Sequence, residues 1–505
     1  MRKCFLVMVS TLAVGCSSSP QDVPPAGDAS GDSSGDATSD SGGDAHADAN
    51  GADVQDPGDA APDGISDAWD EADASADAEQ DTADDGADAT EAGAYVPVEL
   101  RAGLIHTGPV RVSTPPTWNA HLPKLVGDGA AWYAVHTHYP QDVAGRYAAI
   151  MRRTEGASPD AWTEVARVAY PHQPPGVVID TSRRLHVVFD CLRPGSADVT
   201  CFQGGAGTGG NTSRFYHLVF ATRDAGDQLR MDTYANYNEW TAESNGYHGI
   251  GTTSDGTTVW ALADSGWGRV VQWWTSGTQY GTTATLTVPN AYLLYPLITG
   301  HPSLGSGQLT LYAGEFDPGG GSNASYVAST AFAGSTLSLS PLFRRAPSQP
   351  QPGTTNAYPS DLAYDEQGTL YALSYLLDGA GGCTELLRFA GGLGQSPDVL
   401  PVGCVSNYAK LKFSSDGTLY LVTPGTAADV VIGVSVDRGT SWAWHTIPIS
   451  GLPDNGDTRY VGFTPVKEYH SPTVYEPNRW VLFFAGLDSS GLARSSYVGV
   501  VDLAP

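Results

Sequence analysis

Residues 435–442 read SVDRGTSW, and this octet is the local signal from which the fold can be worked out. Asp437 can accept hydrogen bonds from nearby backbone N–H groups, and Gly439 can adopt a positive φ at no steric cost. Trp442 would then anchor the strand that returns from the turn. The octet therefore predicts a self-supporting β-hairpin and contains no obvious catalyst.

A longer unit recurs along residues 96–505. It consists of His or Tyr, a short apolar strand, a turn of the Asp-Gly kind and a second apolar strand, as in YAKLKFSSDGTLYLV from Tyr408. The seven copies begin at His121, His172, His248, His301, Tyr358, Tyr408 and His470. Asp-Gly between apolar runs is a strong hairpin signal, and it is weakest in the fourth and seventh copies.

The repeat length fits one four-stranded blade with its loops. We therefore predict an all-β fold, a seven-bladed β-propeller of four-stranded blades. Only 35 residues follow His470, too few for four strands. Residues 101–113 supply a spare strand, which we expect to complete the last blade and close the ring. A pair of β-sandwiches is the alternative.

The octet resembles the Asp-box, or BNR repeat, of sialidase-like propellers. The looser stretches TRDAGDQL from Thr222 and SPDAW from Ser158 are similar to it. The resemblance implies a hairpin on the rim of a blade, between its third and fourth strands. A sialidase proper is disfavoured, because no Arg-Ile-Pro occurs and the adjacent arginine pairs are not spaced like that family's triad.

The N-terminus reads MRKCFLVMVSTLAVGC, with two basic residues before an apolar run of about a dozen residues, too short to span a bilayer. Leu12 to Cys16 resemble a bacterial lipoprotein cleavage site, which implies a signal peptide at 1–15 and a lipid on Cys16. Residues 16–95 follow, with 22 acidic residues after Cys16 and no Lys or Arg. This Asp/Ala/Gly/Ser-rich segment is typical of a disordered linker. We expect an exported protein, held at the outer membrane or cell surface by its lipid alone.

The net charge of −29 argues against nucleic-acid binding, which needs clustered basic residues. Four cysteines of the exported part suggest two local disulfides, Cys191 with Cys201 and Cys383 with Cys404. Zinc is disfavoured, because no CxxC occurs and no His stands at ligand spacing from these thiols. We expect no metal, no cofactor and a monomer.

Five of the seven copies begin with His: His121, His172, His248, His301 and His470. In a propeller this position lies at one mouth of the central channel, where imidazoles can act as acid, base or ligand. The alternative is that an aromatic ring here packs between blades, as Tyr358 and Tyr408 suggest. A metal bound by three imidazoles is a third interpretation, but a seven-fold ring would hold them too far apart.

The first copy carries the richest pattern, because VHTHY at 135–139 places His136 and His138 on one face of a strand. It resembles the BNR-4 type of propeller, a group that includes ulvan lyases. The resemblance implies an active site formed by His121 and His138 with a Tyr and an Arg. Tyr216 and Arg214 are the candidates for these two roles, by local character only.

Aromatic residues before His248 form a second candidate for sugar binding, above all Trp240 and Tyr247. Packing in the core is the alternative for this segment too. Two functions stay open. The propeller binds or cleaves an extracellular polysaccharide, with β-elimination at the His-rich mouth as one mechanism. Alternatively it is a non-catalytic propeller for protein recognition or for organising the cell envelope.

Overall fold

The structure is a computed structural model. It describes residues 100–503 except 110–120, 139–146, 170–173, 192–213, 222–229, 237–247, 254–255, 257, 264–268, 276–279, 287–291, 301–307, 317–323, 334–335, 350–356, 379–380, 406–407, 426–428, 453–463, 469, 473 and 488–492. All of these residues belong to one compact unit, Asp63–Pro505. The predicted signal peptide, lipidated Cys16 and linker lie outside the described residues, as does the predicted domain boundary at residue 96.

Every described element is a β-strand, so the predicted all-β class is confirmed. Three sheets have four strands each. The first contains β2 (Leu125–Gly127), β3 (Ala131–His138), β4 (Tyr147–Thr154) and β5 (Thr163–Ala169). The second contains β6 (Gly176–Ile179), β7 (Arg184–Cys191), β8 (Arg214–Ala221) and β9 (Arg230–Asn236). The third contains β18 (Ala357–Tyr364), β19 (Leu370–Asp378), β20 (Gly381–Phe389) and β21 (Asp398–Leu400).

Two further sheets have eight strands each. One runs in the order β10 (Gly249–Thr252), β11 (Thr258–Ala263), β12 (Arg269–Thr275), β13 (Tyr280–Leu286), β17 (Thr336–Arg345), β16 (Ala324–Ala333), β15 (Gln308–Phe316) and β14 (Tyr292–Thr299). The other runs in the order β22 (Lys410–Phe413), β23 (Leu419–Pro424), β24 (Asp429–Ser435), β25 (Ala443–Ser450), β1 (Leu100–Pro109), β28 (Ala493–Asp502), β27 (Arg479–Leu487) and β26 (Thr464–Pro465).

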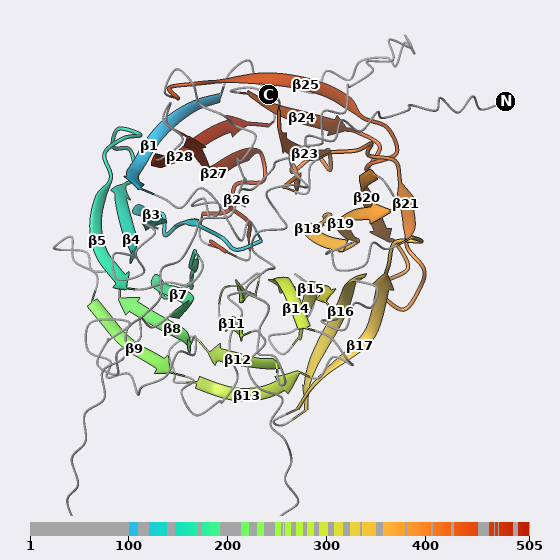
Figure 1. Ribbon diagram of the computed structural model, residues 1–505, viewed down its shortest axis with the longest axis horizontal. Coiled ribbons are helices and arrows are strands. Elements are labelled where there is room, and N and C mark those ends of the chain that lie inside the picture. The colour runs from blue at the N-terminus through green and yellow to red at the C-terminus, as the bar shows by residue number, and fades with distance from the viewer. Residues whose placement is uncertain are drawn as a thin grey trace, which may run out of the picture. The chain divides into compact units, whose positions relative to one another are not determined.

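The sheets lie around a common centre in a propeller-like arrangement, with β5, β9, β13, β17, β21 and β25 at the periphery (Figure 1). Strand β1 pairs antiparallel with β28 from Ala102 opposite Gly499 to Pro109 opposite Ala493. The spare N-terminal strand expected from the sequence therefore does join the last sheet. Among the described residues, no helix is long and apolar enough to cross a membrane.

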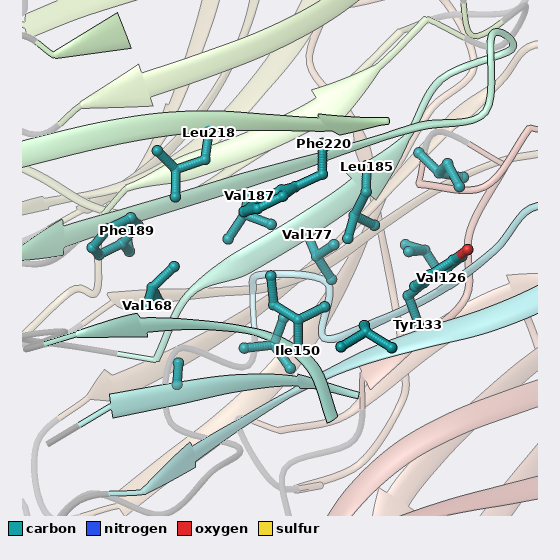
Figure 2. Close-up of a cluster of buried hydrophobic side chains, with 14 of the residues drawn as sticks. Val126, Tyr133, Ile150, Val168, Val177, Leu185, Val187, Phe189, Leu218 and Phe220 are labelled. Atoms are coloured by element: carbon teal, nitrogen blue, oxygen red, sulfur yellow. The ribbon is translucent and has the colours of Figure 1, made fainter. Parts of the chain in front are cut away.

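The core consists of apolar layers between the faces of neighbouring sheets. Figure 2 shows one such layer, in which Tyr133 and Ile150 of the β2–β5 sheet meet Val187, Phe189 and Leu218 of the β6–β9 sheet. All five side chains are almost completely buried. Since burying one large apolar side chain stabilises a fold by about 1.5–3 kcal/mol, these layers hold adjacent sheets together.

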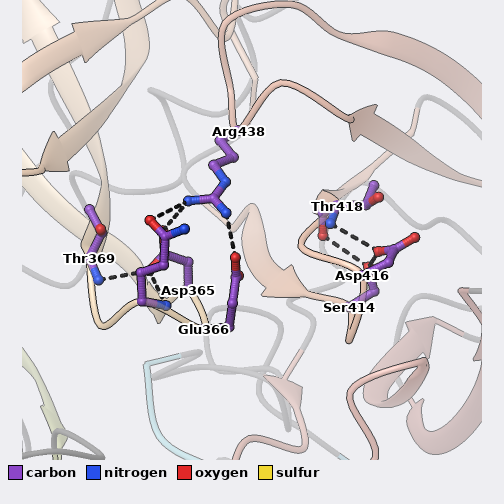
Figure 3. Close-up of polar contacts among 8 residues, drawn as sticks. Asp365, Glu366, Thr369, Ser414, Asp416, Thr418 and Arg438 are labelled. Atoms are coloured by element: carbon purple, nitrogen blue, oxygen red, sulfur yellow. Dashed lines mark hydrogen bonds and ion pairs between the residues drawn. The ribbon is translucent and has the colours of Figure 1, made fainter.

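The Asp-Gly signals form the turns that the sequence predicts. Between β2 and β3, Oδ1 of Asp128 accepts hydrogen bonds from the N–H groups of Ala130 and Ala131 at 2.9 and 2.7 Å. Gly129 has a φ of 84°, a value that favours glycine. Between β22 and β23, Asp416 accepts from the N–H of Thr418 at 3.0 Å (Figure 3).

The SVDRGTSW octet links the end of β24 to the start of β25, the third and fourth strands counted from β22, as predicted. Asp437 Oδ1 accepts from Ser435 Oγ and from the N–H of Ser441, both at 2.8 Å, and its Oδ2 accepts from Ser441 Oγ at 2.6 Å. Burial opposes ionisation of Asp437, but these hydrogen bonds outweigh it and lower its pKa. The carboxylate serves the turn, which is structural.

In two repeat copies the first residue stands at another place relative to the inner strand than the sequence predicts. Strand β14, at one end of its eight-stranded sheet, ends before His301, and strand β26, at one end of the other eight-stranded sheet, ends before His470. Both histidines therefore follow an inner strand in sequence, and the prediction that they precede one is wrong. These are the two copies with the weakest turn signal. His301 itself lies outside the described residues.

One predicted disulfide, between Cys383 and Cys404, is present, and it ties β20 to the segment after β21. Cys201 lies outside the described residues. The pairing of Cys191 with Cys201 therefore stays a prediction.

Candidate functional site

His121 stands just before β2, and only 5% of its surface is exposed. Its Nε2 lies 2.9 Å from the carbonyl oxygen of His248. A carbonyl only accepts, so Nε2 carries the proton and Nδ1 is the basic atom of a neutral ring. Burial, as the largest cause, together with Lys124, lowers the pKa of His121 well below its usual value, against the opposing effect of the His248 carbonyl. His121 is therefore neutral at pH 7.

Tyr295 of β14 faces this histidine, with ring centroids 5.3 Å apart. Its φ of 51° is unusual for a bulky side chain, and it precedes Pro296 at an irregularity of the β14–β15 pairing. Tyr358 of β18 continues the row at 6.2 Å from Tyr295. Tyr295 thus stands between His121 and Tyr358 in a row of three rings.

A second group lies where β3, β4 and β5 run side by side. His138, the last residue of β3, pairs in register with Tyr147, the first residue of β4, and their rings stack at 4.4 Å with an angle of 15°. The Arg167 guanidinium of β5 lies 3.7 Å from the centroid of the Tyr147 ring. His138 and Tyr147 are half-buried and Arg167 is exposed. We call His138, Tyr147 and Arg167 the stacked triad.

The charge state of this triad follows from its surroundings. Burial lowers the pKa of His138, and His106 and Arg167 lower it further, so the ring is a neutral base at pH 7. Its Nδ1 is buried and makes no hydrogen bond with any described residue. Arg167 donates from Nε and Nη2 to the two oxygens of Glu164, both at 2.9 Å. The guanidinium thus already holds a carboxylate in a two-point grip.

The third group is a pair of histidines near the triad, and one of them, His106, influences the pKa of His138. His106 of β1 stacks on His136 of β3, with ring centroids 4.5 Å apart. His136 Nδ1 lies 2.6 Å from Ser496 Oγ of β28. Strands β1 and β28 come from opposite ends of the chain. The contacts of His136 with His106 and Ser496 therefore form only when these two strands pair.

The residues predicted for one site fall into separate places. His121 meets His248 as the repeat position suggests, whereas the described contacts of His138 are with Tyr147 and its neighbours. No described contact joins His121 to His138. Tyr216 and Arg214 lie in β8, paired in register with Phe189 and Cys191. His470 lies after β26 and is buried.

Four predicted binding residues lie outside the described residues, namely His172, His301, Trp240 and Tyr247. The catalytic and binding roles assigned from the sequence therefore stay predictions. Within the described residues no group of three His, Cys, Asp or Glu side chains could hold a metal ion.

Sequence reasoning missed Tyr147, Arg167, His106 and Tyr295. The alternation of His136 and His138 pointed to the right strand. The partner of His138 could not be read without the length of the loop that joins β3 to β4, since that length sets the register.

No protein-family model matches the chain, and no curated protein matches it. Solved structures that are similar include polysaccharide lyase Uly1, at 10% identity and a TM-score of 0.48, covering 76% of this chain and 90% of that one. An ulvan lyase of family PL25 matches at 13% identity and a TM-score of 0.45, covering 81% and 96%. The α-L-arabinofuranosidase Arb93A from Fusarium graminearum matches at 12% and 0.39, covering 65% and 92%. Likenesses of this strength carry neither a reaction nor a residue role over to this chain.

Proposed function

We propose that this protein binds an acidic extracellular polysaccharide and cleaves it by β-elimination at the stacked triad. The observation that carries the proposal is the triad itself. A neutral histidine, a phenol and a guanidinium lie in contact across three adjacent strands, with His138 and Tyr147 half-buried and Arg167 exposed. Elimination from a uronate needs these three chemical abilities together.

The roles follow from the chemistry of each group. His138, a half-buried neutral imidazole at the end of β3, takes the proton from the carbon next to the uronate carboxylate. Arg167 binds that carboxylate and so stabilises the negative charge that develops there. Tyr147 gives a proton to the leaving oxygen as the carbon–oxygen bond breaks and a carbon–carbon double bond forms. Each product end is then complete without water.

The salt bridge to Glu164 supports the role of Arg167. It is exposed, with half of the Arg167 side chain accessible, and exposed pairs contribute little to stability. A uronate carboxylate can therefore replace the Glu164 carboxylate on the same two N–H groups. The Glu164 carboxylate therefore marks where the uronate carboxylate of the substrate would bind Arg167.

We further propose that the sheets form seven blades and that the protein is anchored to the cell envelope through Cys16. Strand pairing supports the count of blades. The eight-stranded sheets are joined by parallel pairing at two residue pairs each, β1 with β25 and β13 with β17. Dividing them there leaves seven groups of four strands.

The proposed lipid anchor on Cys16 has its own test. Radiolabelled lipid should be incorporated into the unchanged protein and not into Cys16→Ser.

The test of catalysis is a depolymerisation screen on polyuronides, read as the ultraviolet absorbance of unsaturated products. Removing a general acid or base lowers the rate by about 10²–10⁴-fold, and this is expected for Tyr147→Phe, which removes the acid, and for His138→Ala, which removes the base. Arg344→Ala is the matched control, because Arg344 grips Glu315 in the same two-point manner on an outer strand. Equal rates in His138→Ala and the control would overturn the proposal.

A non-catalytic propeller is the second candidate, and burial of the mouth residues favours it. His121, His248 and His470 are 5%, 0% and 4% exposed, as expected if the repeat position serves packing. Under this function the protein binds polysaccharide or protein without changing it. This second function would be supported if the protein sedimented with a polysaccharide but released no product from it in the depolymerisation screen.

A further inference from the structure

The lysines of this chain are placed in an unusual way. Apart from Lys3, the sequence has lysine only at positions 124, 410, 412 and 467. All four are at most 5% exposed, although lysine is almost never fully buried unless paired. Lys124 Nζ donates to the carbonyls of Pro174 and Pro175 at 3.0 and 2.7 Å, and Lys410 Nζ donates to that of Ser360 at 2.5 Å. These two lysines each join one sheet to the next.

Lys467 differs, because it also binds a buried carboxylate. Its Nζ lies 2.7 Å from Asp361 Oδ2 and 3.0 Å from the carbonyl oxygen of Leu362, both in β18. It also donates to the carbonyl of Leu411 in β22. Asp361 Oδ2 accepts the Leu411 N–H at 2.6 Å as well. One ammonium group thus joins two sheets around a shared carboxylate.

Lys467 belongs to a segment that leaves the two-residue strand β26 and runs among the inner strands. We call residues 466–468 and 470–472 the central segment. The carbonyl of His470 accepts from the N–H of Ile179 in β6 at 3.0 Å. Ser471 Oγ accepts from the N–H of Gly127 in β2 at 3.0 Å. A Cβ on Gly256, in the turn after β10, would collide with the Pro472 ring.

The central segment therefore contacts all five sheets. It reaches β2 through Ser471, β6 through His470, the turn after β10 through Pro472, and β18 and β22 through Lys467. Lys467, His470 and Ser471 are buried. The segment also holds its own turn, since the N–H groups of His470 and Ser471 donate to the Lys467 carbonyl at 3.0 and 3.1 Å.

We propose that the central segment is a latch that keeps the ring of sheets closed, with the Lys467–Asp361 pair as its anchor. When the anchor releases, His470 and Ser471 leave β6 and β2 together, because one short turn carries all three contacts. Opening at the anchor is thus coupled to sheets that Lys467 never touches. This device is independent of whether the protein cleaves polysaccharide.

The test is hydrogen exchange by mass spectrometry on the full chain, following peptides that contain Gly127 and Ile179. Their N–H groups bind the latch, so their exchange reports its opening. Lys467→Met leaves Asp361 buried without its cation, and exchange in both peptides should rise by about tenfold or more. Asp361→Asn keeps the shape of the site and should act in the same direction, and it serves as the test if Lys467→Met does not fold.

Lys410→Met is the matched control. It removes a second buried lysine that binds β18, but one outside the central segment, so exchange at Gly127 and Ile179 should stay as in the unchanged protein. Faster exchange confined to the peptides of Asp361 and Leu411 would overturn the proposal. An equal rise in Lys410→Met and Lys467→Met would overturn it too, because it would mean general loosening.

Discussion

Arg438 Nη1 of the SVDRGTSW octet lies 3.1 Å from Asp365 Oδ2, in the turn between β18 and β19 of the neighbouring sheet (Figure 3). The same guanidinium binds Gln367 Oε1 at 3.0 Å and Glu366 Oε1. Arg438 has a φ of 61°. The octet is therefore a turn that also clamps two sheets together. An analogous clamp joins Arg183, with a φ of 60°, to Asp128 at 3.1 Å.

Two substitutions of Arg438 distinguish the contribution of its ion pairs to stability from the cost of its backbone strain. Arg438→Ala loses the ion pairs and keeps the strain, whereas Arg438→Gly loses the pairs and relieves about 1–2 kcal/mol of strain. We expect both variants to unfold at lower urea concentration, with Arg438→Ala the less stable. Arg344→Ala, at an exposed pair, should change little. An Arg438→Ala variant as stable as the unchanged protein would show that the clamp contributes nothing.

Glycine in the octet is required for space as well as for its φ. A Cβ on Gly439 would lie 2.8 Å from Leu386 Cδ2 and 3.0 Å from Leu400 Cδ1, at a φ of 93°. We expect Gly439→Ala to cost about 2–4 kcal/mol in the free energy of unfolding, from strain plus overpacking. Gly129→Ala, with a φ of 84° and open space around its Cβ, isolates the strain at about 1–2 kcal/mol. Equal losses in denaturant titrations would refute the packing argument.

The pH dependence of stability follows from the buried histidines. Burial lowers the pKa of His121, His136, His186, His217 and His470 in the folded state. The unfolded chain then binds more protons than the folded one below about pH 6.5, so stability falls as pH falls, by up to about 1.4 kcal/mol per pH unit for each histidine. Melting temperatures between pH 8 and pH 5 should drop steeply. His136→Gln should reduce the slope, and a flat profile would contradict this reasoning.

The disulfide between Cys383 and Cys404 closes a loop with a sequence separation of 21 residues. Its reduction should lower the free energy of unfolding by about 3 kcal/mol. The double variant Cys383→Ser/Cys404→Ser should lose about as much in urea titrations without reductant, and a double variant as stable as the unchanged protein would contradict this. If reductant still destabilises the double variant, another disulfide is responsible.

Much of the fold could be predicted from local turn chemistry. Asp128, Asp416 and Asp437 accept the hydrogen bonds expected of their sequence patterns, and β1 closes the ring as its spare position suggested. The predicted start of a repeat copy was wrong where no Asp-Gly turn follows the inner strand. Strand β26 has only two residues, because the chain leaves it for the central segment. So short a strand shows no alternation of apolar and polar residues in the sequence.

The candidate site could be predicted only in part. His138 was visible as an alternating histidine at a strand end. Tyr147 and Arg167 join it through strand register, and His106 approaches it because the two ends of the chain pair. Register and closure depend on the whole ring, so no local pattern could reveal these partners.

The most direct test of the proposed elimination is mass spectrometry of oligosaccharides released from a polyuronide that the protein degrades. Elimination breaks the chain without adding water and leaves an unsaturated uronate at one new end. We predict products of this kind from the unchanged protein and from Arg344→Ala, and none from His138→Ala. Products that have gained water, or unsaturated products undiminished in His138→Ala, would contradict the account.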